Sequence, residues 1–329
     1  MPLKTLLAVG FGLAATALVA TPLDAVAQEF PSKPVSLVMP YSAGGPGDTL
    51  SRIIGQGLTK VLGKAVIVEN VPGAGGTIGS AKVANARPDG HTLLMTHVSH
   101  ATNPALYPKL PYDSVGGFEP VGIVADLPMA FVARKDFPAA DFAGFLAHVR
   151  ANKDKVTYGH AGVGSASHLC GLLFFGAIET QVTTVPYKGT GPAMNDLMGG
   201  QIDAMCDQTL NVVSPLRAGR VKAFAVTSKT AVDALPGLPT VDASGVPGFE
   251  VGIWYALFAP KGTPRPVIDK LVSGLNTALQ DPEVTSKLAD LGAVAASPER
   301  ARPDALRAHL RSEIDRWGPV IKKAGVYAE

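Results

Sequence analysis

The chain has 329 residues, a formal net charge of +2 and 17% charged residues. This is the composition of an ordinary globular protein, and the length is sufficient for two domains. The chain has neither a basic run typical of nucleic-acid binding nor an acidic tail. We therefore expect no nucleic-acid partner.

The first 27 residues have the pattern of a secretory signal peptide. Lys4 precedes an apolar run at residues 6–20, and residues 25–27 (Ala-Val-Ala) fit the small-x-small rule for cleavage. A permanent membrane helix is the alternative, but the run is short and rich in Ala and Gly. We expect residues 1–27 to be removed and the mature protein to be exported and soluble.

Strands and helices alternate in the first part of the mature chain. Residues 35–39 predict a buried strand, residues 49–62 an amphipathic helix, and residues 65–69 and 91–96 two further strands. Asp48 is expected to cap the first helix, with a ligand contact as an additional possibility, and Thr77 to cap a second, short helix. The βαβαβ order predicts a parallel sheet.

The middle of the chain repeats this plan between two β-rich segments. Residues 119–134 and 251–264 predict strands that cross between two lobes, and residues 266–329 are mainly helical. We expect an α/β fold in which residues 28–126 with 251–329 form lobe 1 and residues 127–250 form lobe 2. The two crossing strands would form a hinge, with a ligand cleft between the lobes.

The two cysteines, Cys170 and Cys206, both fall in the predicted second lobe. An even number of cysteines in an oxidising compartment permits one disulfide. Two buried free thiols are the alternative, because a sequence does not show whether two Cα atoms approach closely enough. We predict that the two cysteines are bonded, which a count of free thiols in the denatured, unreduced protein would test.

Three loops of lobe 1 follow expected strand ends, at residues 41–48, 72–77 and 96–103. In an open parallel sheet the ligand binds there, where helix N-termini favour an anion and glycines let the backbone approach it. None of the loops contains Lys or Arg, which a nucleotide would normally recruit. A tight turn is the alternative for one loop alone, but a third Gly-rich loop at residues 160–168 favours a binding cleft for a compact carboxylate.

Motifs for nucleotide, metal or hydrolase chemistry do not fit this sequence. "GGPGDT" matches neither the dinucleotide fingerprint nor the phosphate loop, and no Gly follows two residues after Ser165, as a nucleophile elbow requires. Four histidines lie in or near the loops without a Cys or carboxylate at metal-ligand spacing. These are His97, His100, His160 and His168. We expect no catalytic residue, metal or cofactor.

Several motifs, in order, resemble those of one family. They are "MPYSAGGPGD", "VENVPGAGGTIGS", "PDGHTLL", "NPALYPKLPYD", "VPYKGTGPAMNDLMGGQIDAMCD" and "LPGLPTVDASGVPGFE" followed by "WYALFAPKGTP". Together they resemble the Bug-type substrate-binding proteins of tripartite tricarboxylate transporters, over essentially the whole mature chain. The resemblance implies a periplasmic two-lobe binding protein, similar to type II, that closes on a small carboxylic acid.

The resemblance also implies a set of ligand-binding positions. The first two Gly-rich loops would hold one carboxylate through backbone N–H groups and ordered waters. Side chains of the third loop and of lobe 2 would contact the rest of the ligand. The implied positions are Tyr41, Ser42, Ala43, Gly44, Gly45, Asp48, Gly75, Gly76, Thr77, His97, Ser99, Gly164, Ser165, His168, Thr190 and Asp207.

The expected function is therefore capture of a small carboxylate, a di- or tricarboxylate, an amino acid or an aromatic acid, by a monomeric periplasmic protein. The ligand would pass to membrane permease subunits. Two alternatives stay open at this point: a ligand-sensing subunit of a receptor kinase, and a secreted hydrolase that uses Ser165 with a nearby histidine.

Overall fold

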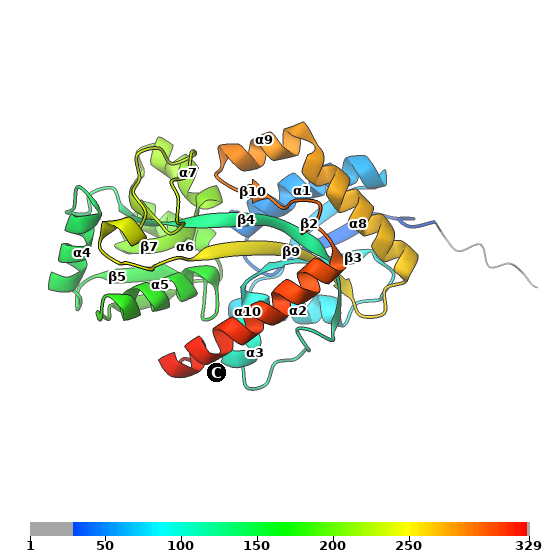
Figure 1. Cartoon of the computed structure of the whole chain (residues 1–329), viewed down its shortest axis with the longest axis horizontal. Helices are drawn as coiled ribbons and strands as arrows, with labels where there is room; N and C mark the ends of the chain where they lie inside the picture. Colours follow the sequence, from blue (N-terminus) through cyan, green and yellow to red (C-terminus); the bar gives the residue numbers. More distant parts are fainter. Residues whose placement is uncertain (1–28, 328–329) are drawn as a thin grey trace, which may run out of the picture.

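The computed structural model describes residues 29–327 and is an α/β fold built on one strongly curled sheet (Figure 1). The strand order is β2-β1-β3-β9-β4-β7-β5-β6, and β8 and β10 also pair with β4. The predicted signal peptide and its cleavage site lie outside the described residues.

The first half of the sheet has the predicted parallel βαβαβ order. It contains β1 (Val35–Met39), β2 (Val66–Asn70) and β3 (Thr92–His97), in which β1 pairs with both neighbours in parallel. The helices that follow these strands are α1 (Pro46–Leu62), α2 (Thr77–Ala84) and α3 (Ser99–Leu106), and a 3₁₀ turn, η1 (Ala74–Gly76), precedes α2. The apolar residues of α1 recur at helical spacing, and all of them except the exposed Val61 are buried.

Two long strands connect this half to the second half. They are β4 (Phe118–Arg134) and β9 (Gly252–Pro260), which pair antiparallel from Phe118 opposite Pro260 to Pro128 opposite Gly252. Figure 1 shows both strands running from one lobe into the other. The predicted crossing strands are therefore present, and residues 119–134 form one continuous strand.

The second half is built on four further strands. They are β5 (Thr157–His160), β6 (Thr183–Pro186), β7 (Ala204–Gln208) and β8 (Val221–Val226). Its helices are α4 (Phe142–Ala151), α5 (Ala166–Ala177), α6 (Thr190–Met198) and α7 (Thr209–Arg217), and a second 3₁₀ turn is η2 (Asp242–Ser244). β5 is parallel to β6 and β7, whereas β4 is antiparallel to β7 and β8.

Alternate residues of β4 serve two cores in this second half. Phe131 and Ala133 belong to the large core, whereas Ala130 and Val132 face a smaller core under α6 and α7. This is the alternation expected of a strand that is buried on both faces.

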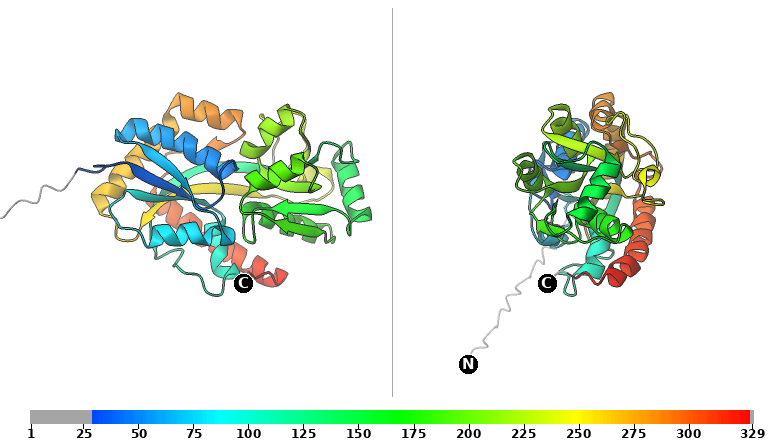
Figure 2. Two further views of the ribbon diagram at one scale, coloured as in Figure 1. Left: turned by 180° about the vertical axis from the view of Figure 1, so that it is seen from behind. Right: turned by 90° about the vertical axis from the view of Figure 1, so that its left-hand side faces the viewer.

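The C-terminal segment returns to the first half of the molecule. It contains α8 (Arg265–Gln280), α9 (Pro282–Asp290), β10 (Val294–Ala295) and α10 (Pro303–Ala324). α8 packs on α1, and α10 packs on α3 and β4, so that the C-terminal end of α10 lies below the junction of the two lobes (Figure 2). Within residues 29–327, no helix has both the length and the apolar character needed to cross a membrane.

Two predicted helix caps are wrong. α1 begins at Pro46, three residues earlier than expected, because proline has the backbone angle of a first helical residue, so Gly45 is the N-cap and Asp48 lies inside the first turn. α2 begins with Thr77 itself, and its N-cap is Gly76, whose φ of 95° is accessible chiefly to glycine.

Candidate functional site

A small cavity lies between the two lobes at the junction of the loops identified in the sequence. It encloses about 20 Å³, and we refer to it as the inner cavity. Residues of both lobes form its wall: Met39, Tyr41, Ser42, Gly45, Pro46, Gly47, His97, Ala161, Ser165, Ala166, Ser167, Thr190, Gln208 and Tyr255.

Four helices begin at this wall. α1 starts at Pro46 after the N-cap Gly45, α5 starts at Ala166 after Ser165, α6 starts at Thr190, and α7 follows its N-cap Gln208. The first N–H groups of a helix have no carbonyl partner inside it, and the dipole places partial positive charge there. The convergence makes the inner cavity favourable for an anion without any cationic side chain.

Two buried polar atoms of this wall have no hydrogen-bond partner. They are the hydroxyl oxygen of Ser42 and the amide oxygen of Gln208. Buried polar atoms in folded proteins nearly always have a partner, so each of these needs an explanation. The Ser42 hydroxyl is also a hydrogen-bond donor that is free to serve a ligand oxygen.

His97 contributes a neutral N–H donor to the same wall. Its Nδ1 accepts the N–H of Ser99 at 3.1 Å, its ring stacks on Tyr41 with centroids 4.8 Å apart, and it meets the edge of Tyr255. Burial lowers the pKa of His97 to about 3. The imidazole is therefore neutral, and because Nδ1 accepts, its proton is on Nε2.

The histidines of the second lobe follow the same rule. His160 Nδ1 accepts the Gly162 N–H at 3.1 Å, and His168 Nδ1 accepts the Gly164 N–H at 3.3 Å. Burial, with a smaller contribution from neighbouring His160, lowers the pKa of His168 to about 4, and burial also lowers the pKa of His160. Both rings therefore hold Gly-rich loop backbone rather than carry charge.

Ser165 has the contacts of a helix cap. Its hydroxyl accepts the backbone N–H of His168 at 3.2 Å and lies 3.2 Å from the Ser167 hydroxyl, while the His168 ring accepts from Gly164. The hydroxyl and the imidazole are thus each engaged with a different partner. This arrangement is that of a capped helix rather than of a nucleophile with its base.

Asp207 lies directly behind the cavity wall and is fully buried. Its carboxylate accepts the N–H of Gln208 at 2.8 Å and a hydrogen bond from the Asn211 side chain. Burial raises the pKa of Asp207 to about 7, and the hydrogen bonds oppose this effect only partly. A carboxyl group that is partly protonated near pH 7 repels an anion in the cavity less than a fully ionised carboxylate would.

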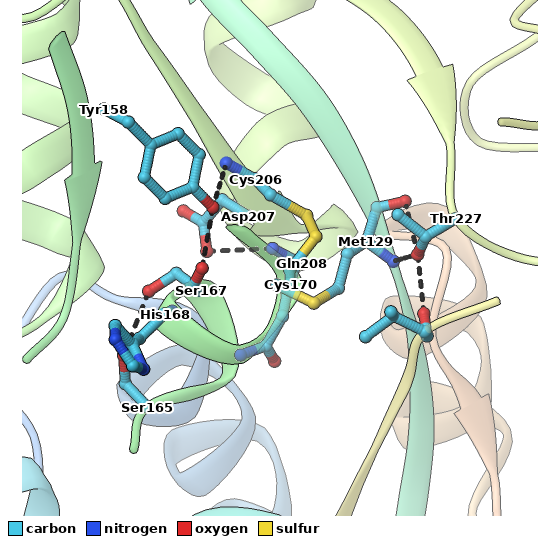
Figure 3. Close-up of a disulfide and its surroundings, with 11 residues drawn as sticks. Met129, Tyr158, Ser165, Ser167, His168, Cys170, Cys206, Asp207, Gln208 and Thr227 are labelled. Carbon is cyan, nitrogen blue, oxygen red and sulfur yellow. Dashed lines mark hydrogen bonds between the residues drawn. A yellow bond between two sulfur atoms is a disulfide. The ribbon is translucent and has the colours of Figure 1, made fainter. Parts of the chain in front are cut away.

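A disulfide ties together the lobe 2 segments that reach the cavity. Cys170 of α5 and Cys206 of β7 are bonded, with 6.2 Å between their Cα atoms. Beside the disulfide, the Tyr158 hydroxyl donates to the Ser167 carbonyl and accepts the Cys206 N–H, as Figure 3 shows. These links hold the start of α5 and the end of β7 in one position relative to each other.

The loops of the two lobes touch across the cleft. Ser42 N–H donates to the Lys188 carbonyl at 3.3 Å, and the Thr102 hydroxyl donates to the Gly164 carbonyl at 3.3 Å. A Cβ at Gly191 would stand 2.9 Å from the Ala43 carbonyl oxygen, so glycine is required for this approach. The structure is therefore a closed form of the clamp.

A second, larger pocket lies beside the inner cavity and shares Tyr41 and Ala161 with it. It measures about 300 Å³, and we refer to it as the outer pocket. Its wall consists of Tyr41, Gly73, Ala74, Gly75, Gly76, Tyr107, Ala161, Gly162, Val163, Tyr187, Lys188 and Tyr327. The Tyr41 hydroxyl donates to the Gly75 carbonyl at 2.8 Å, which holds the tyrosine between the two spaces.

The structure brings half of the residues predicted from sequence to these spaces. Tyr41, Ser42, Gly45, His97, Ser165 and Thr190 line the inner cavity, and Gly75 and Gly76 line the outer pocket. The remainder lies in neither wall: Ala43, Gly44, Asp48, Thr77, Ser99, Gly164, His168 and Asp207. Some of these support the wall, as when the Asp48 carboxylate accepts the Gly44 N–H at 3.0 Å.

Sequence reasoning missed two kinds of wall residue. Gln208 and Tyr255 come from strands read only as sheet elements, and Lys188 and Tyr327 come from a loop and the C-terminal segment. Gln208 is the last residue of the buried strand β7 and the N-cap of α7, a position that could have identified it. Tyr327 had no such signal, because its position depends on where α10 ends in space.

Metal ligation is not supported by the described part of the chain. Within residues 29–327, no group of three or more His, Cys, Asp or Glu side chains is placed to hold a metal ion. The groups of the inner wall that can donate to an anion are backbone N–H groups, hydroxyls and the neutral imidazole of His97.

The fold and the loops match a family of known proteins. Residues 50–326 match the model of the tripartite tricarboxylate transporter family receptor, TctC. Among solved structures, the periplasmic binding protein BugD is 46% identical with a TM-score of 0.89, and the match covers 91% of this chain and all of that one.

Two further similar structures are those of proteins with a bound acid. MatC of Rhodopseudomonas palustris with bound malate is 41% identical, with a TM-score of 0.85 and coverage of 89% and 100%. The R. palustris protein Rpa4515 with adipate is 32% identical, with a TM-score of 0.86 and coverage of 91% and 99%. These matches confirm the two-lobe fold expected from the sequence, and the chain belongs to the tripartite tricarboxylate transporter receptor family of Bug-type periplasmic solute-binding proteins.

Proposed function

We propose that this protein captures a small carboxylate anion in the inner cavity and presents it to the membrane permease subunits of a tripartite tricarboxylate transporter. The observation that carries the proposal is the convergence of four helix N-termini, those of α1, α5, α6 and α7, on one buried space between the lobes. The similar proteins with malate and adipate support a carboxylate as the anion.

The wall of the inner cavity favours a compact anion held by neutral donors. It contains no Lys or Arg, and its side-chain donors include the Ser42 hydroxyl and His97 Nε2. A desolvated carboxylate needs several hydrogen bonds, and its two oxygens can accept about four. A ligand carboxylate that accepts a hydrogen bond from the Ser42 hydroxyl would account for its lack of a partner.

The size of the inner cavity requires the lobes to move. A space of about 20 Å³ accommodates about one or two water molecules, which is less than any di- or tricarboxylate occupies. The ligand therefore enters an open form, and closure about β4 and β9 brings the loops of both lobes onto it. We infer lobe boundaries at 126/127, within β4, and at 250/251, just before β9 begins.

The direct test is a thermal-shift screen of the mature protein against carboxylic acids, with the matching amides and alcohols as controls. An acid present at a hundred times its Kd should add about 2.7 kcal/mol to the free energy of unfolding. The amide of the same acid should have little effect, because it lacks the charge that the helix N-termini favour. A screen in which acids and amides stabilise the protein equally would contradict the proposal.

A further inference from the structure

Asp207 is a buried carboxyl group behind the inner cavity that the proposed function does not use. Its side chain is fully buried and does not itself line the cavity. Two residues that do line the cavity donate hydrogen bonds to it: Gln208 through its N–H at 2.8 Å (Figure 3), and Thr190 through its side chain. At both points a single residue separates Asp207 from the space proposed for the anion.

Asp207 has hydrogen-bond donors but no counter-charge. The side chain of Asn211 in α7 also donates to the carboxylate, yet no Lys, Arg or His within residues 29–327 forms an ion pair with it. Asp48, a buried carboxylate beside the lobe 1 wall, differs in this respect, because Arg52 pairs with it at 2.9 Å. Burial without a cation favours the protonated form, and it raises the pKa of Asp207 to about 7.

The other titratable groups around this carboxyl group keep one charge state near neutral pH. Tyr158 of β5 and Tyr255 of β9 lie close enough to interact with its charge, and burial raises the pKa of both phenols. The cleft histidines His97, His160 and His168 are neutral, because burial lowers their pKa values. β4 places an apolar residue opposite the carboxyl group. Among these groups, only the carboxyl changes its charge near pH 7.

A ligand carboxylate in the inner cavity would bring a second negative charge into the same buried region. Two like charges that share a buried site disfavour the ionisation of one of them, and little water is present to screen them. We propose that Asp207 is a proton-binding site coupled to capture: wherever Asp207 is ionised in the free protein, closure on the carboxylate is accompanied by uptake of a proton from solvent. The proposal rests on the function proposed above and adds a regulation of the same site, since capture becomes tighter as the surroundings become more acidic.

The test is calorimetric titration of the mature wild-type protein with malate, adipate and butyrate, in HEPES and in Tris at pH 7.5. The acids stay ionised at this pH, and the two buffers differ in their enthalpy of protonation, so the difference in heat gives the number of protons taken up. We expect about half a proton or more per bound acid. Between pH 6.5 and pH 8.5 the affinity should fall about fivefold or more.

Asp207→Asn keeps the shape of the side chain and removes the titrating group. In this variant the affinity should change by less than about twofold over the same pH range, with almost no proton uptake. Asp154→Asn is the matched control, because Asp154 is an exposed aspartate of the same lobe outside both walls, and it should behave like wild type.

The possible failures are distinguishable. Proton uptake that is absent from wild type, or that persists in Asp207→Asn, would overturn the coupling while leaving anion capture in the inner cavity in place. A wild-type protein that binds none of the three acids would overturn the proposed function, and the coupling with it.

Discussion

The two lobes present different chemistry to the inner cavity. On the lobe 1 side the wall consists of the backbone at residues 45–47, the Ser42 hydroxyl, the side chains of Met39 and Tyr255, and the stacked rings of Tyr41 and His97. On the lobe 2 side it consists of short polar side chains, the hydroxyls of residues 165, 167 and 190 and the amide of Gln208. Backbone can recognise only a group that all ligands share, whereas side chains can differ in reach and hydrogen bonding.

The support behind the two walls differs as well. Lobe 2 has the disulfide, the Tyr158 hydrogen bonds and buried Asp207 directly behind its wall (Figure 3). Lobe 1 relies on left-handed glycines and on the hydrogen bond from Tyr41 to Gly75. The comparison suggests that lobe 1 holds the shared carboxylate and that lobe 2 selects among ligands, and each prediction below tests one part of it.

The largest expected effect comes from the support of lobe 2. Replacing Cys170 and Cys206 together by Ala should lower the free energy of unfolding by about 4 kcal/mol, since the bond closes a loop with a sequence separation of 36 residues. Affinity for the ligand should fall too, because the ends of α5 and β7 are no longer held together. Chemical denaturation and calorimetry measure the two effects. Two alkylatable thiols in the denatured, unreduced wild-type protein would contradict the bond itself.

The next largest effect is the contribution of Asp207 to the pH dependence of the free energy of unfolding. Its pKa is about 7 in the folded protein and about 4 in the unfolded chain, so between these values the folded state binds one more proton. The contribution of Asp207 to stability is therefore present below pH 4 and is lost as pH rises towards 7. From pH 5 to pH 7, wild type should lose about 2–3 kcal/mol relative to Asp207→Asn.

Titration of the histidines does not affect this comparison of the two proteins. Because burial lowers the pKa values of His97 and His168, acid lowers the free energy of unfolding. This effect is the same in wild type and in Asp207→Asn, so it cancels when the two proteins are compared. Parallel stability curves for wild type and Asp207→Asn over this range would show that Asp207 is ionised when folded. In that case the lobe 2 wall would carry a negative charge beside the proposed anion.

The backbone wall of lobe 1 predicts a uniform loss of affinity. Gly76 lines the outer pocket with φ 95°, and a Cβ there would stand 3.2 Å from the hydroxyl of Tyr41, which also lines the inner cavity. Gly76→Ala should therefore displace Tyr41 and weaken binding of every acid by about 1–2 kcal/mol. Gly63→Ala is the matched control, because its φ is 69° but open space surrounds it. It should destabilise the fold without changing affinity. Gly45, whose φ is −92°, is a poorer target because any residue can adopt that angle.

The smallest effect should come from single side chains of lobe 2. Thr190→Val keeps the shape of the side chain and removes a hydroxyl, which should cost about 1 kcal/mol for acids that bond to it and nothing for the others. His168→Ala should have a smaller, uniform effect, because His168 holds the Gly164 backbone and does not line the inner cavity. If Thr190→Val lowered all affinities equally and Gly76→Ala changed only their ranking, the roles of the two lobes would be reversed.

Ionic strength provides a check on the charge of the site. The alternative cations Arg134 and Arg217 are engaged elsewhere: Arg134 pairs with Asp203 and Asp136, and Arg217 donates to the Asp290 carbonyl. Monocarboxylate binding should therefore depend weakly on salt, since neutral donors hold the group. A steep salt dependence for a monocarboxylate would show that a cation reaches the inner cavity.

The local sequence was sufficient to predict the elements of this fold and its principal loops. The strand at residues 35–39 is found at its predicted bounds, because a short apolar run between turn residues is buried wherever the sheet forms. The Gly-rich loops could also be predicted from local sequence, because a tight strand-to-helix turn needs glycine at fixed positions. Motif order then identified the family over nearly the whole mature chain.

Tertiary structure decided how the parts meet. The wrong caps at Asp48 and Thr77 show that one proline or one left-handed glycine can move a helix start when packing favours it. The bond between Cys170 and Cys206, and the place of Gln208 in the inner wall, depend on how α5 and α7 lie against β7. Lys188 and Tyr327 come together in the outer pocket only because the lobes close and α10 ends beside them. Local patterns determine which residues are buried, whereas contacts between distant segments depend on the path of the whole chain.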